Sequence, residues 1–137
     1  MASSFRIVLD TNVVVSALIS PGVSRDFVFR LLYERKEIVL SDYILSEVED
    51  VLTRHKLRDK TVLDELWQRI IKETVLVQAS WTFPSQAGIL RDPKDHPILQ
   101  TAIKGDAWGI VTGDKDLLVL KIWQGITILR MKDFPWG

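Results

Sequence analysis

The sequence predicts an α/β fold in which a mostly parallel sheet of four to five strands is covered by helices on both faces, giving three layers. Short apolar runs of strand length alternate along the chain with amphipathic stretches of helical period, as is typical of βαβ units. The 137 residues are 47% hydrophobic, which is enough to build one sizeable core. We therefore expect a single domain over residues 1–137, with ligands bound outside the carboxyl ends of the strands.

The chain begins with a strand and two helices. Ile7–Leu9 are a short apolar run typical of a buried strand. Val13–Ile19 fit a short helix, although their β-branched residues leave the period ambiguous. After the turn residues of SPGVS, apolar residues recur at helical spacing from Ser24 to Leu32, so a second, amphipathic helix is expected there.

A second strand and two more helices follow. Ile38–Leu40 form the strand, and Ser41 or Asp42 is placed to cap the next helix, which runs to Leu52. Thr61–Lys72 form another amphipathic helix. The residues expected on its inner face are Val62, Leu63, Leu66, Ile70 and Ile71.

The last part of the chain predicts three strands and a helix. Val75–Val77 are a weak strand, and SWTFPSQAG has neither period and is expected to be a loop. A helix begins near Pro97, because proline suits a first turn, and ends at Gly105. Gly109–Thr112 and Ile126–Leu129 are the remaining strands.

Composition narrows the classes of function. The 18 Lys and Arg residues balance the 18 Asp and Glu residues, so the chain lacks the overall positive charge typical of nonspecific nucleic-acid binding. Cysteine is absent, which excludes disulfides and cysteine-ligated zinc and agrees with a reducing compartment. Because the sequence shows no signal peptide and no apolar run of membrane-spanning length, we expect a cytoplasmic protein.

Acidic residues follow two of the predicted strands. Asp10 ends the first strand, and Asp114 and Asp116 follow the fourth, so in a parallel sheet these carboxylates meet at one edge. Asp92 and Asp95 precede the last helix, whose dipole favours negative charge. Each acid has an ordinary interpretation as a helix cap or a turn residue. Their convergence, however, would raise pKa values unless a cation neutralised the charge.

A further acid lies on the helix after the second strand. Glu47 is on one flank of the apolar stripe of that helix, Glu49 is on the other flank and Asp50 is opposite. Periodicity therefore does not single out Glu47, which can equally be a solvated surface residue.

Clustered carboxylates suit Mg²⁺ or Mn²⁺, which prefer oxygen ligands. Zinc suits the sequence less well, because only His55 and His96 are available and they lack the spacing of paired ligands. An acidic magnesium site that is open to solvent is typical of phosphodiester cleavage, in which metal ions activate water and stabilise the leaving oxygen. The residues alone thus favour phosphoryl transfer.

Four motifs, IVLDTNVVVSAL, LSDYILSEVEDVL, RDPKDHPILQTA and IVTGDKDLL, occur in this order and together resemble those of the PIN-domain nucleases. The likeness is greatest to the small prokaryotic VapC-like toxins of toxin–antitoxin systems, and it runs from about Ile7 to Phe134. It implies a three-layer PIN fold.

The resemblance also implies a site. Asp10, Glu47, Asp95 and Asp114 correspond to the catalytic metal ligands, with Asp116 as a further metal-binding carboxylate. Three other residues take supporting positions: Asn12 as a polar neighbour that orients Asp10, Thr112 as a small hydroxyl residue near the site, and Asp92 as an accessory acid. His96 departs from the family pattern, since many relatives have asparagine there, and it could alter substrate contacts.

The implied activity is Mg²⁺- or Mn²⁺-dependent hydrolysis of single-stranded RNA by a toxin whose partners are an antitoxin protein and a second copy of the chain. The alternative is a catalytically weak PIN fold that acts as a protein- or RNA-binding module. The presence of all four acids argues against this alternative.

Contacts with RNA are less visible in the sequence than the acids. A basic stretch could hold phosphates, or it could be a solvated loop; its residues are Arg54, Lys56, Arg58 and Lys60. Among the five tryptophans, Trp67 and Trp108 fit core or interface positions, and the candidates for exposed aromatic contacts are Trp81, Trp123 and Trp136.

Overall fold

The computed structural model describes residues 5–55, 61–79 and 96–136, and the architecture below is that of these three ranges. One six-stranded sheet has the strand order β3-β2-β1-β4-β6-β5. All neighbouring strands are parallel except β5, which is antiparallel to β6. The strands are β1 (Arg6–Leu9), β2 (Glu37–Ser41), β3 (Val75–Val77), β4 (Gly109–Val111), β5 (Ile122–Trp123) and β6 (Ile126–Leu129).

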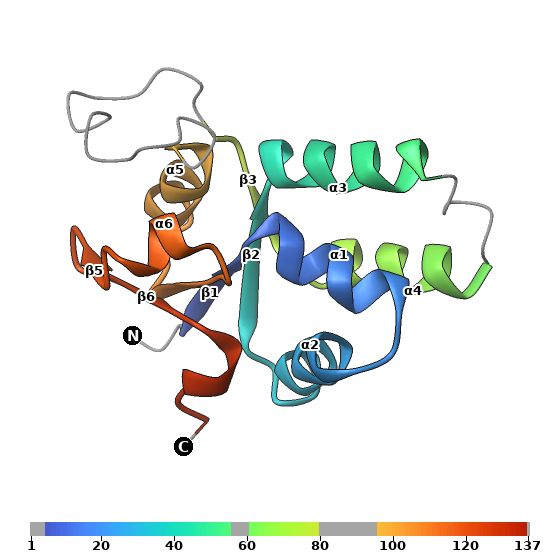
Figure 1. Cartoon of the computed structure of the whole chain (residues 1–137), viewed down its shortest axis with the longest axis horizontal. Helices are drawn as coiled ribbons and strands as arrows, with labels where there is room; N and C mark the ends of the chain where they lie inside the picture. Colours follow the sequence, from blue (N-terminus) through green and yellow to red (C-terminus); the bar gives the residue numbers. More distant parts are fainter. Residues whose placement is uncertain (1–4, 56–60, 80–95, 137) are drawn as a thin grey trace.

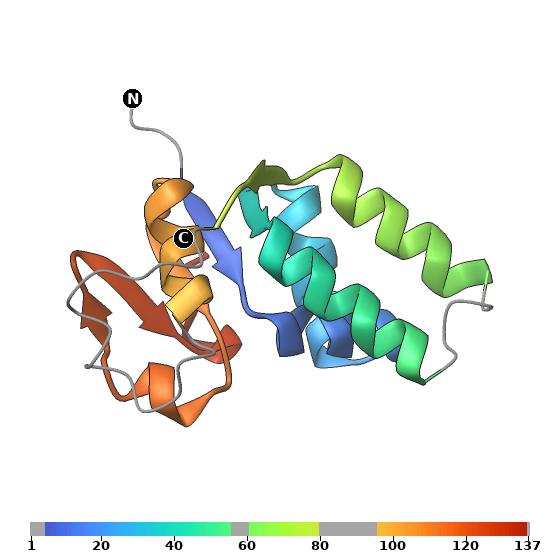
Figure 2. The same cartoon turned by 90° about the horizontal axis from the view of Figure 1, so that it is seen from above.

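Helices cover both faces of the sheet, as the direction of the crossovers requires. The chain moves from β1 to β2 to β3 in one direction and then returns to β4 on the other side of β1. Because parallel crossovers are right-handed, this reversal places α1 to α4 on one face and α5 on the other (Figures 1 and 2). The helices are α1 (Thr11–Ile19), α2 (Val23–Tyr33), α3 (Asp42–Arg54), α4 (Thr61–Lys72), α5 (His96–Lys104) and α6 (Lys115–Leu118).

The core lies around the central strands. Ile7, Val8 and Leu9 of β1 are fully buried, as are Ile38 and Val39 of β2. A parallel strand that is covered on both faces needs apolar residues on both, which explains why these strands are continuous apolar runs rather than alternating ones. In the described part of the chain, no helix is long and apolar enough to span a membrane.

The α/β fold with its mostly parallel sheet is confirmed, and all five expected strands are present. The expected range of four to five strands was too low by one, because β5 was missed. This two-residue strand pairs with β6 through a two-residue loop, Gln124 and Gly125, whose φ angles of 50° and 81° are both positive. Positive φ at both positions is what a type I′ hairpin turn requires.

Two further expectations about packing were wrong. Val62 is 68% exposed, whereas Trp67 is fully buried and takes the central place on the inner face of α4. Trp123 is 6% exposed and therefore belongs to the core instead of forming an exposed aromatic contact. Trp108 and Trp136 are half-buried, and Trp81 lies outside the described residues.

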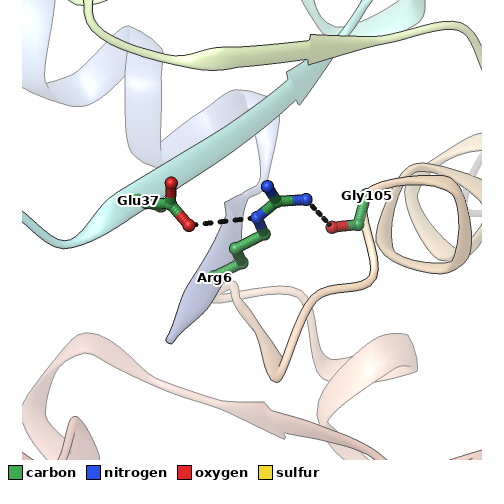
Figure 3. A network of polar contacts seen from close by, with 3 residues as sticks. All are labelled: Arg6, Glu37 and Gly105. Atoms are coloured by element: carbon green, nitrogen blue, oxygen red, sulfur yellow. Dashed lines mark hydrogen bonds and ion pairs between the residues drawn. The ribbon is translucent and has the colours of Figure 1, made fainter. Parts of the chain in front are cut away.

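The amino end of β1 is held by a polar network (Figure 3). Arg6 Nε donates to Glu37 Oε1 of β2 at 3.0 Å, and Arg6 Nη1 donates to the carbonyl oxygen of Gly105, after α5, at 3.0 Å. Gly105 packs closely against the sheet, because a Cβ atom there would lie 2.5 Å from Val39 Cγ1. This end of the sheet is thus held by close packing at Gly105 and by the half-buried guanidinium of Arg6.

Gly105→Ala should lower the free energy of unfolding by about 1–3 kcal/mol, because the added methyl group overpacks the contact with Val39. The matched control is Gly113→Ala, since a Cβ atom at Gly113 would meet no other atom within 4 Å, and its effect should stay within about 0.5 kcal/mol. Urea unfolding of both variants measures the difference. Equal stabilities would contradict the close packing of Gly105.

Candidate active site

Asp10 is the first residue after β1 and also the N-cap of α1. Its backbone N–H donates to the Val111 carbonyl oxygen at 3.0 Å, and its Oδ1 accepts a hydrogen bond from the Thr11 backbone N–H at 2.7 Å. The residue is only 8% exposed. The cap interpretation of Asp10 is therefore correct, and the residue combines a capping role with a place at the carboxyl edge of the sheet.

Thr112 connects Asp10 to the acids that follow β4. The Thr112 hydroxyl donates to Asp10 Oδ2 at 2.6 Å and accepts a hydrogen bond from the Asp114 backbone N–H at 2.9 Å. Asp114 in turn caps α6, because its Oδ1 accepts from the Asp116 backbone N–H at 2.9 Å. The structure therefore brings Asp10, Thr112 and Asp114 together. We call the two carboxylates, Asp10 and Asp114, the acid pair.

The charge of Asp10 is costly in this position. Burial raises the pKa of its carboxyl above the ordinary value, the hydrogen bonds from Thr112 and Thr11 lower it in part, and the nearby charge of Asp114 raises it further. No Lys, Arg or His of the described residues forms an ion pair with Asp10. The ionised form of Asp10 therefore lacks a compensating cation within the described protein.

The structure separates the two glutamates that periodicity left equivalent. Glu49 is half-buried and its Oε2 accepts a hydrogen bond from Trp67 Nε1 at 2.6 Å, so it links α3 to α4. Glu47 is exposed on α3. Glu49 thus has a structural partner that the sequence could not reveal.

The remaining predicted residues are distributed as follows. Asn12 is exposed near the acid pair, but the hydrogen bonds that orient Asp10 come from Thr11 and Thr112. Asp116 is half-buried. His96 is the first residue of α5. The predicted residues that lie outside the described ranges are Asp92, Asp95, Lys56, Arg58 and Lys60.

Arg54 is the one described member of the basic stretch. It is exposed and pairs with Asp50 on its own helix, with a distance of 3.2 Å between Arg54 Nε and Asp50 Oδ2.

Within the described ranges, no three Asp, Glu or His side chains gather closely enough to hold a metal ion. Asp10 and Asp114 are therefore a pair, and Glu47 is not gathered with them into such a group.

A cavity of about 630 Å³ opens beside this pair, and Thr112 and Gly113 form part of its wall. The cavity is also lined by α2 and by the segment after β6, which contributes Arg130 and Lys132. These two basic residues were not predicted from the sequence. Their signal was present, because they directly follow a parallel strand and so emerge at the same edge as Asp10 and Asp114.

In the presence of EDTA, Asp10→Asn should raise the melting temperature at pH 7. An acid whose pKa is higher in the folded chain than in the unfolded chain stabilises the fold only at low pH, and this contribution is lost as the pH rises through the folded pKa. The advantage of the variant should therefore shrink as the pH is lowered from 7 towards 4. Thermal melts followed by circular dichroism at several pH values measure it, and a variant less stable than wild type at pH 7 would contradict the assigned cost of the charge.

Comparisons with known proteins identify the family of the chain. The family model described as "PIN domain" matches residues 6–116. The chain is 30% identical over 117 residues to the uncharacterized protein MJ1680 of Methanocaldococcus jannaschii, and the match covers 85% of this chain and 75% of that protein.

Two solved structures share the fold. VapBC2 from Rickettsia felis, solved bound to a DNA fragment from its promoter, has a TM-score of 0.60 at 18% identity, covering 90% of this chain and 96% of that one. FitAcB from Neisseria gonorrhoeae has a TM-score of 0.56 at 16% identity, covering 93% of this chain and 99% of that one. The motif order, the sheet and the matched residues together show that the chain belongs to the PIN domain family, whose members are generally nucleases.

Proposed function

We propose that the chain is a metal-dependent endoribonuclease that hydrolyses phosphodiester bonds in single-stranded RNA and serves as the toxin of a toxin–antitoxin pair. The observation that carries this proposal is the acid pair at the carboxyl edge of the sheet, in which Asp10 is buried next to Asp114 without a described cationic partner. Two ionised carboxylates held close together repel each other, and a bound cation removes this repulsion. The pair therefore favours binding of a cation.

The donor set fits Mg²⁺ or Mn²⁺. The described donors at this edge are carboxylate and hydroxyl oxygens, which hard divalent cations prefer over nitrogen or sulfur. In the proposal, Asp10, Glu47, Asp95 and Asp114 are the catalytic metal ligands and Asp116 is a further metal-binding carboxylate. The supporting residues are Asn12, Asp92 and Thr112. Such a metal would supply an activated water and neutralise charge on the phosphate.

The residues of the chain itself position the site. The Thr112 hydroxyl and the Thr11 N–H each hold one oxygen of Asp10, so the orientation of that carboxylate is fixed before any ligand arrives. Asp114 Oδ1 is held by the N–H of Asp116 at the start of α6. Preorganised carboxylates of this kind reduce the cost of ordering the site when substrate binds.

An antitoxin protein and a second copy of this chain are the proposed protein partners. Support comes from the motif resemblance to VapC-like toxins and from the shared fold with VapBC2 and FitAcB. Because the proposed substrate is cellular RNA, the proposal places the protein in the cytoplasm.

One observation favours a second candidate function, a catalytically weak PIN fold that binds RNA or protein. Among the described residues only two of the four proposed ligands come together, so a complete metal site depends on Glu47 and Asp95 as well. The cleavage assay below distinguishes the two functions.

Cleavage of a labelled single-stranded RNA should require Mg²⁺ or Mn²⁺ and should stop in EDTA. Asp10→Asn and Asp114→Asn should each lower the rate by about a hundredfold or more, a loss typical of removing a group that stabilises charge in the transition state. Glu47→Gln should also lower the rate, whereas Glu49→Gln on the same helix should not, because its side-chain oxygen can still accept from Trp67.

Gel analysis of the products over time measures these rates. Cleavage that persists in EDTA, or that survives Asp10→Asn, would contradict the assigned site. A folded, metal-supplied wild type that binds RNA without cleaving it would favour the second candidate.

A further inference from the structure

The cavity beside the acid pair has an apolar and aromatic wall. Val13 and Phe27 are buried at this wall, and Trp136 from the C-terminal segment is half-buried there. The Trp136 ring centroid lies 5.5 Å from that of Phe27 and 4.5 Å from that of Phe134, so its neighbours hold the indole in place. The volume of about 630 Å³ is within the range of pockets that take small ligands.

The rim of the cavity is positively charged although the chain as a whole is neutral. The charged residues among its described lining are Arg30, Arg130 and Lys132, together with one acid, Asp26. Arg130 and Lys132 are exposed, and neither forms an ion pair with a described residue. Arg30 pairs with Glu34 at 2.8 Å, and its guanidinium carbon lies 4.0 Å from the centre of the Trp136 ring.

The cavity and the acid pair share a wall. Thr112 donates its hydroxyl proton to Asp10 and also lines the cavity, as does Gly113 next to it. A ligand that contacts Thr112 in the cavity is therefore one side chain away from Asp10. One nucleotide of an RNA strand would contact all three features. Its base would meet the apolar aromatic surface, its phosphate the basic rim, and its reacting phosphodiester the neighbouring acid site.

We propose that this cavity binds one unstacked nucleobase of a single-stranded RNA, with the adjoining phosphates against Arg130 and Lys132. The inference rests on the proposed function, since it places the base next to the phosphodiester bond that the acid pair would act on. The expected ligand is single-stranded RNA, because a base inside a duplex is stacked and cannot enter a cavity of this kind. The basic rim makes a nucleic acid the expected occupant rather than an apolar peptide segment.

Binding in EDTA tests the proposal without cleavage. The probes are a fluorescein-labelled six-residue oligoadenylate and an abasic strand with the same number of phosphates, each followed by fluorescence anisotropy. Wild type should bind the oligoadenylate at least tenfold more tightly than the abasic strand, which corresponds to about 1.4 kcal/mol. Trp136→Ala should remove that difference. Equal binding of the two strands by wild type would overturn the proposal.

A second variant covers the case in which Trp136→Ala does not fold. Val23 lines the cavity, is 75% exposed and begins α2, so Val23→Glu should leave the fold intact while placing a carboxylate at the cavity. It should weaken oligoadenylate binding at least tenfold. The matched control is Val62→Glu, at the start of α4, where the side chain is 68% exposed and lies close in sequence to the basic stretch.

The control should bind like wild type. If Val62→Glu weakened binding as much as Val23→Glu, or if only Val62→Glu weakened it, the strand would not be held by the cavity and the proposal would be overturned.

The basic rim has its own readout. Arg130→Gln and Lys132→Gln should each weaken the binding of both strands. Each should also lower the number of counterions released on binding by about one. The control, Lys104→Gln on α5, should change neither quantity. No change in the rim variants would overturn the assignment of the phosphates.

The outcomes also separate this inference from the proposed function. RNA cleavage that is unaffected by Trp136→Ala and Val23→Glu would refute the base site and leave the nuclease standing. Base-dependent binding without any cleavage would refute the nuclease and leave the base site standing.

Discussion

The hydrogen bond from the Thr112 hydroxyl to Asp10 Oδ2, at 2.6 Å, is the contact on which the geometry of the site depends. It exists because β1 and β4 are adjacent and parallel with Leu9 opposite Val111, so that the next residues of the two strands, Asp10 and Thr112, emerge side by side. The same hydroxyl accepts from the Asp114 N–H, which fixes the turn that carries the second carboxylate. Strand register thus determines where the carboxylates lie, and the packing at Arg6 and Gly105 holds that register from the far end of the sheet.

The charge of Asp10 lowers the stability of the folded chain at a position with a proposed function. A buried carboxylate next to another carboxylate destabilises the folded chain, as the raised pKa of Asp10 indicates. Part of this cost is offset because Asp10 caps α1 and accepts two short hydrogen bonds. A purely structural cap would not need the second carboxylate nearby, since serine or asparagine would serve as well without the charge. This arrangement is the support for the cation site that we propose.

Much of the fold could be predicted from the sequence because buried parallel strands are continuous apolar runs with turn residues at their ends. Asp10 and Asp114 could be placed at one edge for the same reason, whereas Thr112 was placed near them by the resemblance to the family. Other features depend on contacts between distant residues. Glu49 is distinguished from Glu47 by its half-buried position and by the hydrogen bond from Trp67 of α4. The cavity forms only when the segment containing Arg130 and Trp136 packs beside α2. The strand β5 was not predicted because two residues are too few to show a period. The turn at Gln124 and Gly125 is compatible with a hairpin, but it did not identify one.

A crystal structure of the protein soaked with Mn²⁺, with anomalous scattering data collected near the manganese edge, tests the proposed cation site directly. The proposed cation site requires a manganese ion bound by carboxylate oxygens of Asp10 and Asp114, and no such ion in crystals of Asp10→Asn treated in the same way. Manganese bound away from both carboxylates, or an acid pair that stays free of metal at millimolar Mn²⁺, would contradict it.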